Sequence, residues 1–515
     1  MLRVAMTESG MVAGTPGTDA RITVFKGIPY AADTSGENRW RPPQPPKKWE
    51  GIRKCYEFAP ITMQRTPGKD PNAFYSKEWH VDPDIPMSED GSLVVNIWTP
   101  AKSADERLPV MVWIFGGGLQ EGYAHEMEFD GERIASRGVI LVTVAYRLNV
   151  FGFLAHPDLT AENPDEPTNF GFLDQRAGIM WVKRNIANFG GDPDNITILG
   201  QSSGGVSVFS HLCSPRSKGL FQKAVIQSSA GGSVLPVYPK TPFREALSLA
   251  EAEEYGVRFL REQLGVETIA EARKLDANFI RDKCVESRSW FSYVIDGKFL
   301  TETITSCLFG GRMHNAPVLI GYTGDEMPLG VPGGTDAQVE AWAMENFGAY
   351  AEEFIATCRE KAQREGIPLH KAAMVNVNEN STRIIAEELS RQGRTVYAYE
   401  FDPEIPGDDA GAFHSCDLWF TFETLMKCWR PFEGRHYDLA RKMCNYWTNF
   451  AKKGDPNGLD ANGTSMPKWT PYTAESPLVM NFHDEIGMED LSAADAKREV
   501  MLRANKETYY KLYKK

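Results

Sequence analysis

The sequence lacks the features that would assign it to metal, phosphate or membrane chemistry. Its eight cysteines form no Cys-x-x-Cys pair and no metal-like spacing with histidine. Neither a Walker-type glycine loop nor a His-Glu-x-x-His motif is present, so we expect no cofactor and no metal. The longest uncharged stretch, residues 195–215, contains five serines, a glutamine and a histidine, which makes it a poor membrane span.

Positive charge is also scarce. The 515 residues include 56 Lys and Arg against 69 Asp and Glu, for a net charge of -13. Such a chain repels phosphate backbones and anionic lipid heads, so we expect neither nucleic acid nor a membrane as a partner. The first residues, MLRVAMTESG, lack the apolar core of a secretory signal. We expect a cytoplasmic protein that is a monomer or a small homo-oligomer.

Short apolar runs alternate with helical stretches along the chain. The runs 109–115 and 139–146 are rich in Val and Ile, which is typical of strands buried on both faces, and residues 174–188 have helical spacing. This alternation predicts an α/β fold with a large, mostly parallel central sheet and helices on both faces. The runs near 21–26 and 93–98 have no helix directly between them, so we expect them to extend the sheet antiparallel.

Three segments do not fit the alternation of strands and helices: approximately 55–90, 234–312 and 328–390. Ligands of open α/β sheets bind beyond the carboxyl ends of the strands, where inserted segments would roof and shape a pocket. No linker, repeat or low-complexity tract marks a domain boundary. We therefore expect one domain over residues 1–515 with these insertions above its site.

The sharpest motif is GQSSG at residues 200–204, between the apolar run 196–199 and a segment able to start a helix. A G-x-S-x-G sequence in this context is typical of a nucleophile elbow, where small neighbours allow a strained serine backbone. Ser202 is therefore the candidate nucleophile. The alternative is a turn rich in Gly and Ser that has no chemical role.

A second glycine cluster, FGGG at residues 115–118, follows a predicted strand. Glycines there allow backbone N–H groups to point into a cavity. Two of these amides and the amide of Ser203 would form a three-donor oxyanion hole. A dinucleotide loop starting at Gly116 does not fit, because it needs glycine where the chain has Glu121.

A serine nucleophile needs a base, and the base needs an acid to orient it. Among nine histidines the strongest candidate is His414, in the loop sequence GAFHSCD. Asp325 and Glu326 follow a predicted strand at 317–321, and the residues alone leave the choice between them open. The chain order serine, acid, histidine is that of α/β-hydrolases and differs from those of chymotrypsin and subtilisin.

Over nearly its whole length the chain resembles the type-B carboxylesterase family, which also contains the cholinesterases. The resemblance implies an α/β-hydrolase fold, with the insertions over the active site, and a bacterial-type intracellular member of the family. The motifs that carry it are FKGIPYA at 25–31, RWRPP at 39–43, WIFGGG at 113–118, VAYRLNVFGFL at 144–154, NIANFGGDPDNITILGQSSGG at 185–205, GDE at 324–326, GAFHSCDL at 411–418 and YWTNFAKKGDPNG at 446–458.

The resemblance also assigns the catalytic triad. It implies Ser202 as the nucleophile, His414 as the base and Glu326, rather than Asp325, as the acid. None of these residues needs a metal or a cofactor for its role.

The same resemblance places the oxyanion hole and one supporting residue. The donors would be the backbone N–H groups of Gly117, Gly118 and Ser203. Ser228 matches a position that in the family supports the triad by hydrogen bonding, although it could equally be an ordinary buried serine at a strand end.

Three departures from the family pattern are informative. Gln201 replaces the usual acidic residue before the nucleophile, which removes a negative charge and disfavours a cationic substrate. Ser415 replaces the glycine expected after the catalytic histidine. The sequence SEDG at 88–91 replaces SEDC, so the disulfide of secreted members cannot form. This last difference supports an intracellular location.

Aromatic residues near the motifs predict an apolar, partly aromatic pocket, although most of them could equally belong to the core. Trp79 resembles the choline-binding tryptophan of cholinesterases in position, but it lies two residues further from the MSED motif. The candidates are Trp79, Phe115, Trp290, Phe291, Trp419, Phe420 and Phe422.

These observations predict a serine carboxylesterase that acts on small-molecule esters through an acyl-enzyme. We expect uncharged esters with short acyl groups and aryl or alkyl alcohols. The alternatives are an amide, carbamate or specialised ester hydrolase with the same triad and, more remotely, a non-catalytic cholinesterase-like binding protein. A histidine base predicts that kcat/KM falls on acidification near pH 6.5.

Overall fold

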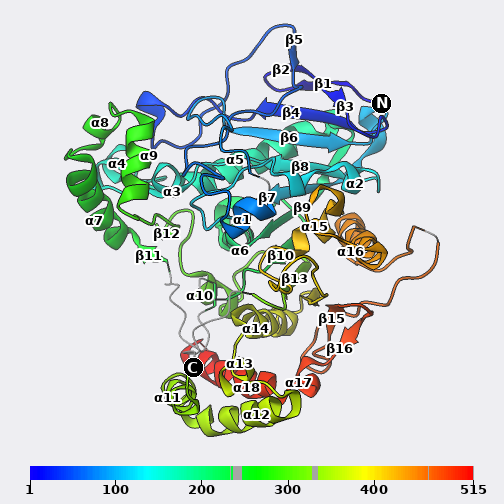
Figure 1. Ribbon diagram of the computed structural model, residues 1–515. Coiled ribbons are helices and arrows are strands. Elements are labelled where there is room, and N and C mark those ends of the chain that lie inside the picture. Colours follow the sequence, from blue (N-terminus) through cyan, green and yellow to red (C-terminus); the bar gives the residue numbers. More distant parts are fainter. Residues whose placement is uncertain (80, 232–233, 236–245, 327–333, 462, 514–515) are drawn as a thin grey trace.

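The computed structural model describes residues 1–79, 81–231, 234–235, 246–326, 334–461 and 463–513. Within them a mixed sheet of eleven strands forms the centre of the molecule (Figure 1). Its strands are β3 (Thr15–Pro16), β4 (Thr23–Pro29), β6 (Val94–Thr99), β7 (Leu108–Ile114), β8 (Ile140–Val144), β9 (Gly191–Gln201), β10 (Lys223–Gln227), β13 (Val318–Thr323), β14 (Val396–Phe401), β15 (Val479–Phe482) and β16 (Ile486–Glu489).

The strand order across the sheet is β16-β15-β14-β13-β10-β9-β7-β8-β6-β4-β3. All pairings from β15 to β8 are parallel, whereas β16, β6, β4 and β3 pair antiparallel at the two edges. The predicted α/β architecture with a mostly parallel sheet is therefore confirmed. The expected antiparallel extension corresponds to β4 and β6.

Helices pack against the sheet and cover both of its faces (Figure 1). The central strands β8, β10, β13 and β14 are buried at every residue, and β7 is buried from Val110 to Ile114, as expected for strands covered on both faces. The helices are α1 (Phe74–Glu78), α2 (Glu132–Ala135), α3 (Asn149–Phe153), α4 (Pro157–Glu162), α5 (Phe170–Asn185), α6 (Ser203–Cys213), α7 (Leu249–Phe259), α8 (Ile269–Ala272), α9 (Ala277–Glu286), α10 (Ile304–Phe309), α11 (Asp336–Phe347), α12 (Ala351–Glu365), α13 (Leu369–Ala372), α14 (Val377–Arg391), α15 (Asp417–Thr421), α16 (Gly434–Lys453), α17 (Leu491–Ala494) and α18 (Ala496–Tyr513).

The helix expected at 174–188 is α5, which starts four residues earlier and is followed by a short 3-10 turn. Gly190 then adopts a φ of 82°, a left-handed conformation that glycine reaches without a steric penalty. The chain turns there and enters β9 at Gly191. This connection matters for the site because β9 leads directly to Ser202.

The three segments outside the simple alternation have different structures. The described part of segment 55–90, which leaves out residue 80, is mainly loop around α1. Segment 234–312 contains α7 to α10, with residues 236–245 outside the described part. In segment 328–390, whose first six residues also lie outside it, α11 to α13 share a small separate hydrophobic cluster with α18, at the lower end of the view in Figure 1. The single-domain assignment stays a prediction.

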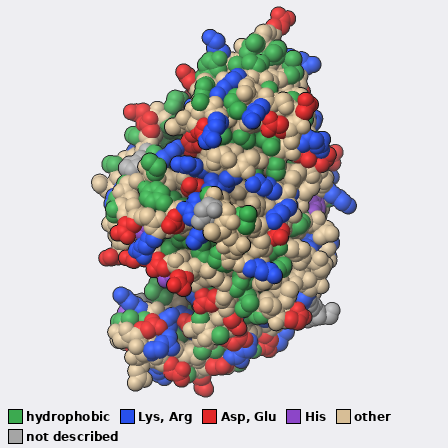
Figure 2. Space-filling view, turned by 90° about the vertical axis from the view of Figure 1, so that its right-hand side faces the viewer, with side chains coloured by type: hydrophobic (Ala, Val, Ile, Leu, Met, Phe, Trp, Pro, Cys, Tyr) green, Lys and Arg blue, Asp and Glu red, His purple; other side chains and the backbone are tan. Residues whose placement is uncertain are grey.

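Two small sheets complete the described structure. One joins β1 (Val4–Thr7), β2 (Gly10–Ala13) and β5 (Ile52–Lys54), and the other joins β11 (Leu247–Ser248) and β12 (Val294–Ile295). On the face seen in Figure 2, acidic and basic side chains are interspersed. None of the described helices combines the length and the apolar run needed to span a bilayer.

Candidate active site

Ser202 stands at a sharp turn between the end of β9 and the start of α6. Its backbone has φ 55° and ψ -128°, a strained conformation for a residue with a side chain. The flanking glycines are required by space: a Cβ on Gly200 would lie 2.4 Å from the carbonyl carbon of Gly204, and a Cβ on Gly204 would lie 2.1 Å from the oxygen of Ile114. The geometry is that of a nucleophile elbow.

The glycine loop after β7 lies against this elbow. Gly117 and Gly118 have φ values of 101° and 66°, which glycine tolerates, and Leu119 N donates to Ser203 Oγ at 3.0 Å. Among the hydrogen bonds of the described residues, none is donated by the N–H groups of Gly117, Gly118 or Ser203. Three backbone donors, one at the N-terminus of α6, are thus available for an oxyanion.

Glu326 and His414 form a buried pair at the carboxyl end of the sheet. His414 Nδ1 is hydrogen-bonded to Glu326 Oε2, and Thr323 N donates to Glu326 Oε1 at 3.3 Å. Burial raises the pKa of the Glu326 carboxyl, but the charge of His414 and its hydrogen bond lower it by more, so the net pKa lies below the ordinary value. Glu326 is therefore ionised and fixes the proton of His414 on Nδ1.

The pKa of His414 moves in the opposite direction. Burial lowers it, but the charges of Glu326 and Asp417 and the hydrogen bond that His414 donates to Glu326 outweigh burial, so the pKa lies above its ordinary value. Asp417 accepts hydrogen bonds from Gln227 Nε2 at 2.9 Å and Tyr399 Oη at 3.0 Å, and burial raises its own pKa to about 6. The base thus faces two acidic groups.

Ser228 interacts only weakly with the pair of Glu326 and His414. Its hydroxyl helps to lower the pKa of Glu326, but its oxygen makes no hydrogen bond of regular geometry. Its backbone is in the left-handed region, with φ 50°. The structure therefore places the Ser228 hydroxyl near the Glu326 carboxylate without a regular hydrogen bond to it.

Gln201 makes an unexpected contact with the base. Its Nε2 lies 3.2 Å from His414 Nε2 and 2.8 Å from Ser415 Oγ. In the described structure, Ser202 Oγ forms no hydrogen bond with His414. The nitrogen that would accept the serine proton is instead occupied by the Gln201 amide. Such bonds to the nucleophile are often long before substrate binds.

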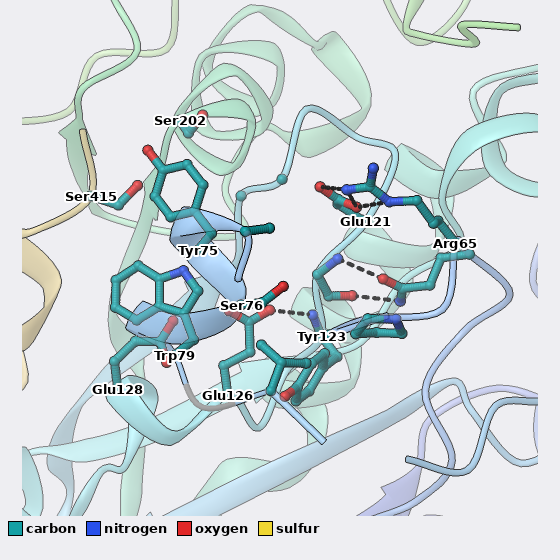
Figure 3. A pocket seen from close by; sticks show the side chains of 18 of the residues that line it. Arg65, Tyr75, Ser76, Trp79, Glu121, Tyr123, Glu126, Glu128, Ser202 and Ser415 are labelled. Carbon is teal, nitrogen blue, oxygen red and sulfur yellow. Dashed lines mark hydrogen bonds and ion pairs between the residues drawn. The ribbon is translucent and has the colours of Figure 1, made fainter. Parts of the chain in front are cut away.

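A cavity of about 630 Å³ extends from these groups. Ser202, His414, Gln201 and the glycine loop line one end, and Tyr75 and Trp79 from segment 55–90 form a wall. Figure 3 shows Ser202 at one end and Glu126 with Glu128 at the other. The described residues of segments 234–312 and 328–390 do not line this cavity.

The aromatic candidates separate into two groups. Trp79 lines the cavity, with Tyr75 stacked on it at 6.3 Å between ring centroids. Trp419 is fully buried behind Trp79, 5.2 Å away, and Phe115 stacks on Tyr146 at 4.3 Å, so both support the site without lining the cavity. Of the others, Trp290 is exposed, whereas Phe291, Phe420 and Phe422 are buried in the core.

Two glutamates at the far end of the cavity were not anticipated from the sequence. Glu128 is only 1% exposed, and Tyr123 N donates to Glu126 at 2.7 Å. Burial raises the pKa of Glu126 to about 7 and that of Glu128 well above its ordinary value. Nearer the solvent, Arg65 pairs with Glu121 at 2.6 Å. The deep end therefore carries little charge in mildly acidic solution.

Among the residues that the structure describes, no group of three or more His, Cys, Asp or Glu side chains is arranged to hold a metal ion. The eight cysteines are all unpaired. The chemistry that this arrangement can perform is nucleophilic attack by Ser202, proton transfer by His414 and stabilisation of a negative oxygen by backbone amides.

Comparison with known sequences places the chain among esterases. The sequence model of the carboxylesterase family matches residues 2–364 and 359–499. The chain is similar to acetylcholinesterase from Bungarus fasciatus, with 29% identity over 93% of this chain and 82% of the relative. It is also similar to fumonisin B1 esterase from Sphingopyxis macrogoltabida, with 30% identity over 94% of this chain and 87% of the relative.

Solved structures show the same likeness. A carboxylesterase from Geobacillus stearothermophilus is 31% identical and superimposes with a TM-score of 0.79, covering 97% of this chain and 100% of that one. A PNB esterase is 28% identical with a TM-score of 0.76, again over 97% of this chain and 100% of the other. The α/β-hydrolase fold implied by the sequence is thereby confirmed.

Proposed function

Since this chain belongs to the carboxylesterase family and is a carboxylic ester hydrolase, we propose that it works through an acyl-enzyme formed on Ser202. The observation that carries this proposal is the buried pair of Glu326 and His414 next to a strained serine at an elbow. Among the described residues, the N–H groups of Gly117, Gly118 and Ser203 donate no other hydrogen bond, and Gly117 lines the cavity together with Ser202, which supports an oxyanion site there.

The reaction follows from the proton positions. Ser202 Oγ attacks the ester carbonyl carbon while His414 Nε2 accepts the serine proton, and Glu326 stabilises the imidazolium through Nδ1–H. The carbonyl oxygen becomes an oxyanion that the amides of Gly117, Gly118 and Ser203 bind. The C–O bond to the alcohol then breaks as His414 returns its proton to the leaving oxygen. Water repeats the sequence and releases the acid.

The proposed substrates are uncharged esters with short acyl groups and aryl or alkyl alcohols. Gln201 is neutral, and the raised pKa values of Glu126 and Glu128 keep the far end of the cavity largely protonated in mildly acidic solution. A cavity of about 630 Å³ can hold an ester of moderate size. The two relatives are named for different esters, so family membership alone does not select the substrate.

A matched pair of substrates tests the charge preference. Acetylcholine and 3,3-dimethylbutyl acetate have nearly the same shape and differ in one positive charge. We expect a higher kcat/KM for the neutral ester, and equal or faster turnover of acetylcholine would contradict the proposal. A series of p-nitrophenyl esters of increasing acyl length, with the matching anilide and carbamate, tests the acyl preference and the alternative leaving groups.

A further inference from the structure

Two departures from the family pattern, Gln201 and Ser415, meet at the catalytic base. They are far apart in the chain, yet the Gln201 side-chain nitrogen lies 2.8 Å from Ser415 Oγ and 3.2 Å from His414 Nε2. All three side chains are buried or nearly so, with Gln201 3% and Ser415 8% exposed. The contact therefore takes place away from bulk water, where each hydrogen bond weighs more.

The contacts around His414 fit a neutral imidazole ring that carries its proton on Nδ1. Nδ1 carries its proton toward Glu326, so Nε2 of the neutral ring has a free lone pair. One N–H of the Gln201 amide donates to that lone pair, and its second N–H donates to Ser415 Oγ. In the imidazolium, Nε2–H would face an amide N–H, and two donors repel each other. The contact therefore favours the neutral ring.

Ser415 has an unusual backbone for this contact. Its φ of 80° is in the left-handed region, where glycine is favoured and a serine is strained. A glycine would satisfy the turn after His414 without strain. The serine keeps the strain and adds a hydroxyl whose partner is the Gln201 amide. In this arrangement the hydroxyl oxygen accepts one N–H of the Gln201 amide, while the same nitrogen lies beside His414 Nε2.

We propose that Ser415 and Gln201 act as a positioning pair, in which Ser415 orients the Gln201 amide and the amide holds His414 Nε2 as an unprotonated acceptor. This inference rests on the proposed function, because it concerns the base of that reaction. When substrate arrives, Ser202 takes the place of the amide on Nε2. Gln201 and Ser415 are positioning residues here, and neither exchanges a proton with the substrate.

The other groups around His414 do not provide this effect. Glu326 and Asp417 both favour the charged imidazolium. Tyr75 Oη donates to the backbone oxygen of His414 at 3.1 Å, and burial keeps its phenol and the thiol of Cys416 neutral by raising their pKa values. Among the described groups around His414, Gln201 is therefore the one placed to oppose protonation of the base, and we expect it to extend the working range of the enzyme toward acid.

The test measures the protonation of His414 directly. The Nδ1–H proton in the hydrogen bond to Glu326 is followed by NMR as a function of pH in the Ser202→Ala protein, which requires no turnover. We compare this parent with Gln201→Met, which keeps the length but has no donor, with Ser415→Gly, which removes the hydroxyl and the strain, and with Gln201→Glu.

The proposal predicts a graded rise in the pKa of His414. Gln201→Met and Ser415→Gly should raise it by about half a unit or more, and Gln201→Glu by about one unit or more, because a carboxylate favours the imidazolium. In the Ser202 enzyme the acidic limb of kcat/KM should move by the same amounts. A role in packing alone would lower activity equally at every pH.

Two results would contradict the proposed positioning role of Gln201 and Ser415. One is an unchanged pKa in both Gln201→Met and Ser415→Gly, and the other is a fall in either protein. If one of the two variants does not fold, the remaining one decides. Failure of the proposed function is seen separately, as undiminished ester hydrolysis by Ser202→Ala, and the NMR titration still decides the role of Gln201 in that case.

Discussion

Asp325 and Glu326 are consecutive residues whose carboxylates hold different parts of the same loop. Glu326 Oε2 is hydrogen-bonded to the ring of His414, whereas Asp325 Oδ2 accepts from the backbone N–H of Ala412 at 2.8 Å. Asp325 also pairs with Phe413 in a short parallel bridge. The residues alone did not decide between Asp325 and Glu326 as the acid. In the structure Glu326 orients the base, and Asp325 positions the loop that carries it.

This division predicts different effects for two isosteric substitutions. Glu326→Gln should lower kcat by on the order of 10³- to 10⁴-fold, because the amide cannot stabilise the imidazolium or fix its tautomer. Asp325→Asn keeps an oxygen acceptor for Ala412 N, so kcat should fall by less than about 10-fold while the melting temperature drops. Steady-state kinetics with a p-nitrophenyl ester and thermal melts check both. A larger kinetic loss for Asp325→Asn would contradict the assignment.

The pH dependence of turnover follows from the raised pKa of His414. The base must be neutral, so kcat/KM should fall as pH decreases through that pKa, which lies above 6.5 because Glu326 and Asp417 favour the charged ring by more than burial opposes it. From the sequence alone, this fall in kcat/KM is expected near pH 6.5. In Asp417→Asn the midpoint should move to lower pH, since one negative neighbour is removed. A midpoint at or below 6.5 in the native enzyme would contradict the geometry.

The glutamates at the end of the cavity predict a pH dependence of stability. Burial raises the pKa of Glu126 to about 7, while in the unfolded chain a glutamate titrates near 4.3. The free energy of unfolding should therefore be highest below about pH 4.3, as far as this group is concerned, and decrease as pH rises toward about 7. Glu126→Gln should weaken this decrease between pH 5 and pH 8, as measured by thermal melts.

Glu121 supplies the matched control for that experiment. It lies in the same loop but is half exposed and paired with Arg65 at 2.6 Å. Exposed pairs of this kind contribute little to stability. Glu121→Gln should therefore leave the difference in melting temperature between pH 5 and pH 8 unchanged. An equal effect of both substitutions would show that burial of Glu126 is not the cause.

The glycines of the elbow predict a contrast in stability. In Gly204→Ala the new Cβ would lie 2.1 Å from the Ile114 oxygen and 2.7 Å from the Phe115 oxygen, so backbone must move. We expect a loss of about 3 kcal/mol or more, with activity lost as well. Gly434→Ala, at the start of α16, meets no atom within 4 Å and should leave stability unchanged or raise it by up to about 1 kcal/mol. Similar melting temperatures for the two variants would contradict the steric argument.

Elements with strong local signals could be predicted closely from sequence. The run at 109–115 corresponds to β7 within one residue at each end, because a buried parallel strand is apolar throughout. β9 is longer than the apolar run 196–199. Its first residue, Gly191, pairs with Leu108 across the sheet, and tertiary pairing of this kind leaves no mark in hydrophobicity.

The cavity was harder to predict because its surroundings depend on loops. Glu126 and Glu128 are charged residues in a loop, a pattern that normally indicates a solvated surface, yet Glu128 is buried and both line a cavity together with residues of segment 55–90. Trp79 was a candidate and does line the cavity, whereas Trp419 lies behind it. Which aromatic residue faces the cavity is decided by packing across distant segments.

The contact between Gln201 and Ser415 was present in the sequence only as two separate departures from a pattern. Their proximity depends on the left-handed backbone of Ser415 and on the parallel sheet that brings the end of β9 beside the histidine loop. Neither feature has a local signature. Such departures become interpretable when both side chains can be placed around the same atom.

The most direct measurement is the site of covalent modification by a fluorophosphonate, which forms a stable bond with an activated serine. The account predicts one phosphonyl group per chain, located on Ser202 by peptide mass spectrometry, with loss of ester hydrolysis in step with labelling. Ser202→Ala should neither be labelled nor hydrolyse p-nitrophenyl acetate above background. Labelling on another residue, or full hydrolysis by Ser202→Ala, would contradict the account.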